Sequence, residues 1–149
     1  KLARSHVTCA EKETAHHSAI EKNISENTIA ADRAIIVGGD LFEHIEPHQQ
    51  FDAIFSNPPY IDPQNDRSDE NVRSYEPHDA LYGGEHGFAL IERNIKATPN
   101  FLKSGGELWI EHEPEHESAL TTLATMCDYR SCVTHKDQFG IARYSVLTF

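Results

Sequence analysis

The stretch Phe51-Asp52-Ala53-Ile54-Phe55-Ser56-Asn57-Pro58-Pro59-Tyr60 decides how this chain is interpreted. Its first five residues are mostly apolar, and a run of this length predicts a strand. The two prolines then stop the strand, because each fixes φ and removes a backbone donor. Their carbonyl groups still accept hydrogen bonds, Asn57 adds a side-chain carbonyl and Tyr60 a flat ring. Together they predict a rigid acceptor site for a planar –NH2 group at the carboxyl end of a strand, where ligands bind in open α/β sheets.

The rest of the chain alternates between predicted strands and helices. Strand-like runs lie at 7–10, 34–37, 51–55, 108–110, 132–133 and 144–149, and helical periodicity at 15–24, 88–102 and 114–127. This order predicts an α/β fold with a mostly parallel sheet and an antiparallel pair of C-terminal strands. Residues 61–84 are polar and predict a long irregular loop, which in a folded domain is often a functional lid.

Length and charge limit the class of protein. The 149 residues predict a single domain spanning 1–149. The net charge of −11 opposes a polyanion and therefore argues against direct nucleic-acid binding. The longest apolar runs fall far short of the ~18 residues of a membrane span, so we expect no membrane partner. Three cysteines, an odd count at unrelated spacings, favour a reducing cytoplasm.

One string in the sequence imitates a metal site. His112-Glu113-Pro114-Glu115-His116 has the H-E-x-x-H spacing of zinc hydrolases, which requires both histidines on one continuous helix. Here His112 ends a predicted strand and Pro114 begins a predicted helix. The sequence therefore predicts no metal site.

Asn57-Pro58-Pro59-Tyr60 resembles the catalytic motif of class I S-adenosylmethionine-dependent methyltransferases that modify planar nitrogens. The chain as a whole resembles the HemK-type release-factor glutamine methyltransferases. The residues that carry this resemblance are 51–61, Arg73-Ser74-Tyr75-Glu76-Pro77, Ala80-Leu81, Gly83-Gly84, Gly105-Gly106-Glu107-Leu108, Glu111-His112, Lys136-Asp137, Gly140 and Arg143. The Asn-Pro-Pro-Tyr string is shared with adenine-N6 methyltransferases, whereas the Tyr-Glu-Pro loop and the Lys-Asp ending are more selective.

The resemblance implies a Rossmann-like class I methyltransferase fold and a reaction. A methyl group would pass from S-adenosylmethionine to the side-chain amide nitrogen of glutamine in the Gly-Gly-Gln motif of a peptide chain release factor. The implied site residues are Asn57, Pro58, Pro59 and Tyr60 for catalysis; Asn57, Pro58, Tyr60 and Glu76 for the substrate; and Glu11 at the ribose, Asp40 and Leu41 at the adenine, and Asn57 for the cofactor.

The resemblance also has a gap at its N-terminal side. The family's first strand, its glycine-rich cofactor loop and its N-terminal helical domain have no counterpart in these residues. We therefore expect an N-terminally incomplete catalytic domain. Three alternatives stay open: an adenine-N6 nucleic-acid methyltransferase, a ribosomal-protein glutamine methyltransferase, and a non-catalytic fragment that binds a partner chain.

Overall fold

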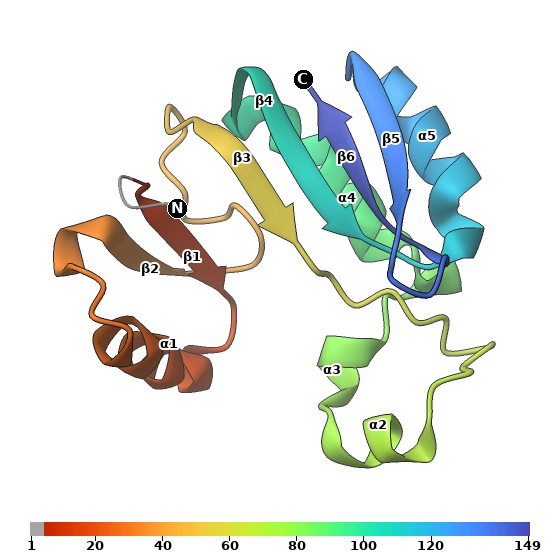
Figure 1. The fold of residues 1–149 in the computed structure, drawn as a ribbon, viewed down its shortest axis with the longest axis horizontal. Coiled ribbons are helices and arrows are strands. Elements are labelled where there is room, and N and C mark those ends of the chain that lie inside the picture. Colours follow the sequence, from red (N-terminus) through yellow and green to blue (C-terminus); the bar gives the residue numbers. More distant parts are fainter. Residues whose placement is uncertain (1–4) are drawn as a thin grey trace. The chain divides into compact units, whose positions relative to one another are not determined.

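The computed structural model describes residues 5–149, and the chain divides into two compact units, Lys1–Pro47 and His48–Phe149. The first unit is a strand–helix–strand arrangement (Figure 1). Its elements are β1 (Val7–Glu11), α1 (Thr14–Glu26), a 3₁₀ turn (Ala31–Arg33) and β2 (Ala34–Gly38). The two strands are parallel and in register from Val7 opposite Ala34 to Glu11 opposite Gly38. Their carboxyl ends therefore lie together.

The second unit contains a four-stranded sheet in the order β3-β4-β6-β5. Its strands and longer helices are β3 (Phe51–Ser56), α2 (Glu70–Tyr75), α3 (His78–Leu81), α4 (Ala89–Ala97), β4 (Leu102–Glu111), α5 (Glu117–Met126), β5 (Ser131–Lys136) and β6 (Ala142–Thr148), with 3₁₀ turns at Glu85–Gly87, Thr98–Phe101 and Pro114–His116. Strands β3 and β4 are parallel, while β6 is antiparallel to both β4 and β5. The predicted antiparallel C-terminal pair is thus confirmed.

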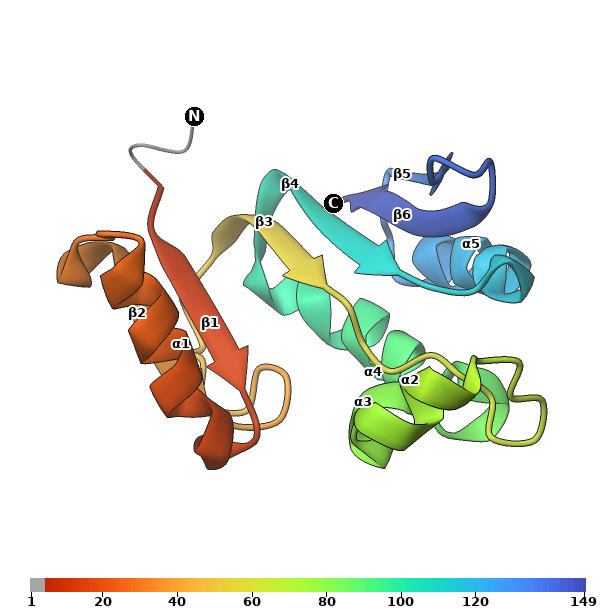
Figure 2. The same cartoon turned by 60° about the horizontal axis from the view of Figure 1, so that its bottom comes forward.

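The hydrophobic core of the described residues lies almost entirely in the second unit. Alternate residues of β4, such as Leu108 and Ile110, are fully buried, because successive side chains of a strand point to opposite faces. They pack against α4 and α5, which lie on the same face of the sheet (Figure 2). In the described part of the first unit, Ile45 is the one buried apolar side chain. Burial therefore stabilises the second unit far more than the first.

Two features differ from the sequence-based expectation. Residues 61–84 are not wholly irregular, since they contain α2 and α3. Leu102, predicted to lie on a helical face, instead begins β4 and is 1% exposed. A core-facing helix and a buried strand both bury an apolar side chain, so the hydrophobicity of Leu102 alone does not distinguish a helix from a strand. Among residues 5–149, no helix is long and apolar enough to cross a membrane.

The buried Tyr129 makes unfolding sensitive to alkaline pH. Its hydroxyl donates to the carbonyl oxygen of Ile95 at 3.1 Å, and burial raises the pKa of the phenol above its ordinary value of 10.0. The unfolded chain then releases this proton at lower pH than the folded chain. The free energy of unfolding should therefore fall as pH rises above the ordinary pKa of tyrosine.

Urea unfolding measured from about pH 8 to about pH 11 checks this. Tyr129→Phe should flatten the alkaline loss relative to wild type, whereas the control Tyr75→Phe should not, because Tyr75 is 86% exposed. Equal slopes for wild type and Tyr129→Phe would contradict the assignment.

Candidate functional site

The Asn57–Tyr60 segment leaves the sheet at the carboxyl end of two adjacent parallel strands. Ser56, the last residue of β3, pairs with Ile110 of β4. The Ser56 hydroxyl accepts a hydrogen bond at 2.5 Å from Nδ2 of Asn94, which is buried on α4. Asn57 then lies exposed, while Pro58 is buried and Tyr60 half-buried. The strand end thus anchors the segment and leaves the Asn57 side chain accessible.

Two glycines lie close against the backbone of this segment. A Cβ at Gly83 would lie 2.5 Å from the carbonyl oxygen of Pro59. A Cβ at Gly87 would overlap the carbonyl oxygen of Tyr60. Gly87 also has φ of +69°, a conformation that side chains disfavour. Gly83 belongs to the motif pattern of the sequence, but sequence reasoning missed Gly87. The only hint in the sequence is that Gly87 follows Gly83-Gly84 after a few residues.

A hydrogen bond fixes the Tyr60 side chain. Its hydroxyl donates to Oε1 of Glu111, the last residue of β4, at 2.8 Å. Burial raises the pKa of the Tyr60 phenol, and the carboxylates of Glu111 and Glu113 raise it further, while Arg143 opposes them. The phenol is therefore neutral at physiological pH and remains a hydrogen-bond donor.

The C-terminal hairpin contributes charge beside this tyrosine. Asp137 Oδ1 accepts from the backbone nitrogens of Phe139, at 2.8 Å, and Ile141, at 3.0 Å, which closes the turn. Arg143 lies 3.1 Å from a carboxylate oxygen of Glu113 and 3.7 Å from one of Asp137. These contacts give a structural role to Asp137 and Arg143.

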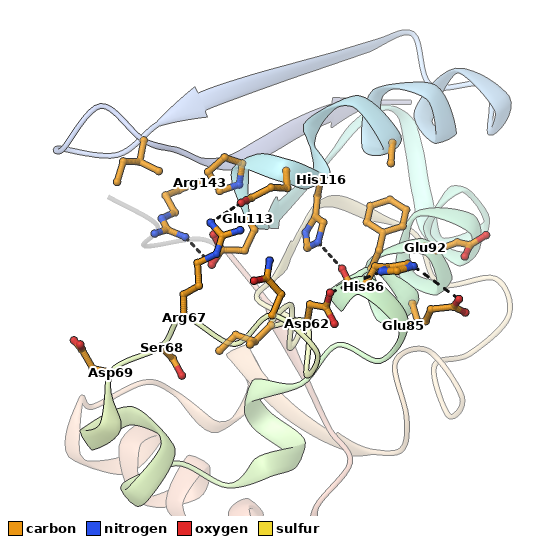
Figure 3. Close-up of a pocket in the computed structure, with 18 residues that line it drawn as sticks. Asp62, Arg67, Ser68, Asp69, Glu85, His86, Glu92, Glu113, His116 and Arg143 are labelled. Atoms are coloured by element: carbon orange, nitrogen blue, oxygen red, sulfur yellow. Dashed lines mark hydrogen bonds and ion pairs between the residues drawn. The ribbon is translucent and has the colours of Figure 1, made fainter.

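A cavity of about 980 Å³ opens next to the motif (Figure 3). Four separate segments line it: the loop after Tyr60, the start of α4 with its preceding turn, the link from β4 to α5, and the hairpin. Carboxylates outnumber arginines on its wall, and one pair, Arg67 and Glu115, lies 3.0 Å apart. His116 also points into it; its Nε2 lies 3.0 Å from the carbonyl oxygen of His86, and its buried Nδ1 has no partner among the described residues. Asn57 does not line this cavity. The cavity itself was not predicted from the sequence.

The first unit carries the remaining predicted cofactor residues. Glu11 ends β1, and Asp40 and Leu41 follow β2, so all three lie at the carboxyl edge of the β1–β2 pair. Oε1 of Glu11 accepts from the backbone nitrogen of Glu13 at 2.8 Å. Leu41 has φ of +54°, which is strained for a bulky side chain and is the kind of backbone conformation that gathers at binding sites.

Two other predicted features lie elsewhere. Glu76 follows α2 and is exposed, outside the cavity wall. The H-E-x-x-H string is split, because His112 follows β4 and His116 lies in a 3₁₀ turn. Both ring nitrogens of His112 already have partners at 2.8 Å, the Ser145 hydroxyl and the Glu113 carbonyl. Within residues 5–149, no cluster of three metal-ligating side chains is present.

The chain is similar in sequence to curated release factor glutamine methyltransferases. No protein-family model matches the chain. A release factor glutamine methyltransferase of Rhodopirellula baltica is 40% identical over 100 residues, which make up 66% of this chain and 34% of that protein. One from Francisella tularensis is 31% identical over 137 residues, 92% of this chain and 47% of that protein. The chain thus spans less than half the length of these relatives.

Comparison with solved structures confirms the fold. A methyltransferase from Pyrococcus furiosus has a TM-score of 0.69 and 21% identity, and covers 97% of this chain and 62% of its own. The methyltransferase SMU.776, solved with SAH, has a TM-score of 0.58 and 12% identity over 96% of this chain and 38% of its own. The predicted class I methyltransferase fold is confirmed.

Proposed function

The chain is related to the release factor glutamine methyltransferases, and we propose on this basis that it transfers a methyl group from S-adenosylmethionine to a glutamine side-chain amide of a peptide chain release factor. The observation that carries the proposal is the Asn57–Tyr60 segment. It lies at the carboxyl edge of β3 and β4, and Gly83 and Gly87 approach its backbone so closely that a Cβ at either glycine would collide with it. An acceptor site of this kind suits a planar –NH2 group.

The chemistry of the acceptor explains why rigidity matters. An amide nitrogen is a weak nucleophile, because its lone pair is delocalised into the carbonyl group. S-adenosylmethionine supplies a methyl group on a positively charged sulfur, so accurate placement of the amide can provide much of the rate. Carbonyl oxygens of Asn57 and Pro58 would hold the –NH2 group and favour the positive charge that develops on nitrogen. The sulfur would leave as the neutral thioether of S-adenosylhomocysteine, and the methylated nitrogen, now strongly acidic, would lose its proton to water, so no strong general base is needed.

The carboxyl edge of β1 and β2 is our proposed cofactor-binding region. Glu11 supplies a carboxylate at a strand end, as the acidic residue does for ribose hydroxyls in dinucleotide sites. Asp40 and Leu41 follow the neighbouring strand, where Leu41 has its strained backbone. We assign Glu11 to the ribose and Asp40 and Leu41 to the adenine.

We further propose that both units belong to one catalytic domain. The first unit has a single buried apolar side chain among its described residues, which is too little to stabilise it alone. The Francisella tularensis relative also aligns with 92% of the chain, a span that includes parts of both units.

Methylation assays test the proposed substrate. We expect the full-length gene product, of which these 149 residues form all or part, to transfer labelled methyl to folded release factor. A release factor in which the glutamine of Gly-Gly-Gln is alanine should remain unlabelled. An adenine-containing oligonucleotide should also remain unlabelled, since the net charge of −11 opposes nucleic acid. Label on a ribosomal protein or an oligonucleotide, with none on release factor, would overturn the proposal.

A further inference from the structure

The contact between Tyr60 and Glu111 joins the ends of two neighbouring strands. Because β3 and β4 are parallel, the residues that follow them emerge at the same edge of the sheet. Tyr60 is half-buried, and its ring packs against the hydrophobic core. The 2.8 Å hydrogen bond from its hydroxyl to Glu111 adds a polar contact that fixes the far end of the ring.

The charged groups around this hydrogen bond keep Tyr60 as its donor and Glu111 as its acceptor. Three charged groups face the phenol: Glu111, Glu113 and Arg143. Arg143 is itself held by Glu113 at 3.1 Å, so Glu111 is the carboxylate that accepts the Tyr60 proton in a hydrogen bond. With a raised pKa the phenol stays protonated, and the donor and acceptor keep their roles across the physiological range.

We propose that Glu111 is a positioning residue, which acts by holding the Tyr60 ring in the orientation that borders the acceptor amide. This inference deepens the proposed function and rests on it. Glu111 makes no contact with the substrate in this proposal; its whole effect passes through Tyr60. Such a role matters because a small misplacement of a positioning group can cost up to about 100-fold in rate.

Kinetics of the full-length gene product with release factor test the role. Glu111→Ala should lower kcat by about 10- to 100-fold while the KM for release factor stays within about twofold. Glu111→Gln should restore most of the rate, because the glutamine carbonyl also accepts a hydrogen bond. The matched control is Glu107→Ala. Glu107 lies on the same strand and also accepts from an aromatic side chain, Trp109 Nε1 at 3.0 Å, yet its loss should leave kcat unchanged.

A double-mutant cycle separates positioning from direct action. Tyr60→Phe keeps the ring but loses the tether, so it should lower kcat about as much as Glu111→Ala. In the Tyr60→Phe background, Glu111→Ala should have no further effect. A further loss in that background, a wild-type kcat for Glu111→Ala, or a raised KM with unchanged kcat would each overturn the inference.

Tyrosine absorption at neutral pH provides a readout that does not depend on methyl transfer. The ultraviolet difference spectrum between each protein and its Tyr60→Phe variant should shift to shorter wavelength in Glu111→Ala, because the phenol no longer donates to a carboxylate. An unchanged difference spectrum would contradict the contact. A wild-type protein that methylates no glutamine would overturn the proposed function and the inference with it. If the wild-type protein is active but Glu111→Ala lowers kcat further in the Tyr60→Phe background, the inference alone is overturned.

Discussion

Asn57→Ala is expected to lower kcat for methyl transfer by about 10²–10³, the range for losing one preorganised electrostatic partner. Its side-chain carbonyl is proposed to hold the acceptor –NH2 group and to meet charge that develops in the transition state. An interaction of that kind raises kcat more than it improves substrate binding. Asn57 is exposed, so its truncation leaves no cavity and should not unfold the protein. Single-turnover methyl transfer at saturating cofactor in the full-length gene product measures the effect.

Two variants show whether the effect is specific. Asn57→Asp keeps an acceptor oxygen but adds a charge, so it should retain more activity than alanine and less than wild type. Glu11→Ala should do the reverse of Asn57→Ala and weaken cofactor binding first, because Glu11 is assigned to the ribose. If Asn57→Ala transfers methyl at the wild-type rate, Asn57 is a turn residue and the proposed mechanism fails.

Gly87→Ala is expected to lower the free energy of unfolding by about 2–4 kcal/mol and to remove most activity. Part of the loss comes from the backbone, because φ of +69° is unfavourable for alanine. The rest comes from overlap of the new Cβ with the carbonyl oxygen of Tyr60. Relief of that overlap changes the distance between the turn at Gly87 and the carbonyl group of Tyr60, and we expect the Asn57–Tyr60 segment to move, so activity should fall even at temperatures where the variant stays folded.

Gly105→Ala is the matched control for this substitution. Gly105 has φ of +80°, but a Cβ there would meet no atom within 4 Å among the described residues. It should therefore show the backbone cost alone, about 1–2 kcal/mol, with normal activity in the folded protein. Urea unfolding and methyl transfer on both variants make the comparison. Equal loss of stability and equal activity in the two variants would show that the close approach of Gly87 to Tyr60 has no consequence.

Local features of the sequence determined much of the fold. The apolar run before Pro58 predicted β3, and the prolines predicted its end, because both signals act within a few residues. The absence of a helical pattern between the last two strands predicted their antiparallel pairing. Pro114 likewise predicted that His112 and His116 do not share a helix. Each of these conclusions depends on backbone preferences that neighbouring residues set.

Which distant residues meet at the motif depends on packing between separate elements. Tyr60 and Glu111 are 51 positions apart and touch because β3 lies beside β4, and Gly87 must be glycine because a remote carbonyl oxygen occupies the space of its Cβ. The cavity wall likewise draws on four segments that no local pattern connects. The strand that ends before Asn57, and the kind of groups presented there, could be predicted from the residues alone. Packing between strands and loops decided how those groups are held, because side-chain contacts across a sheet depend on register and not on sequence neighbours.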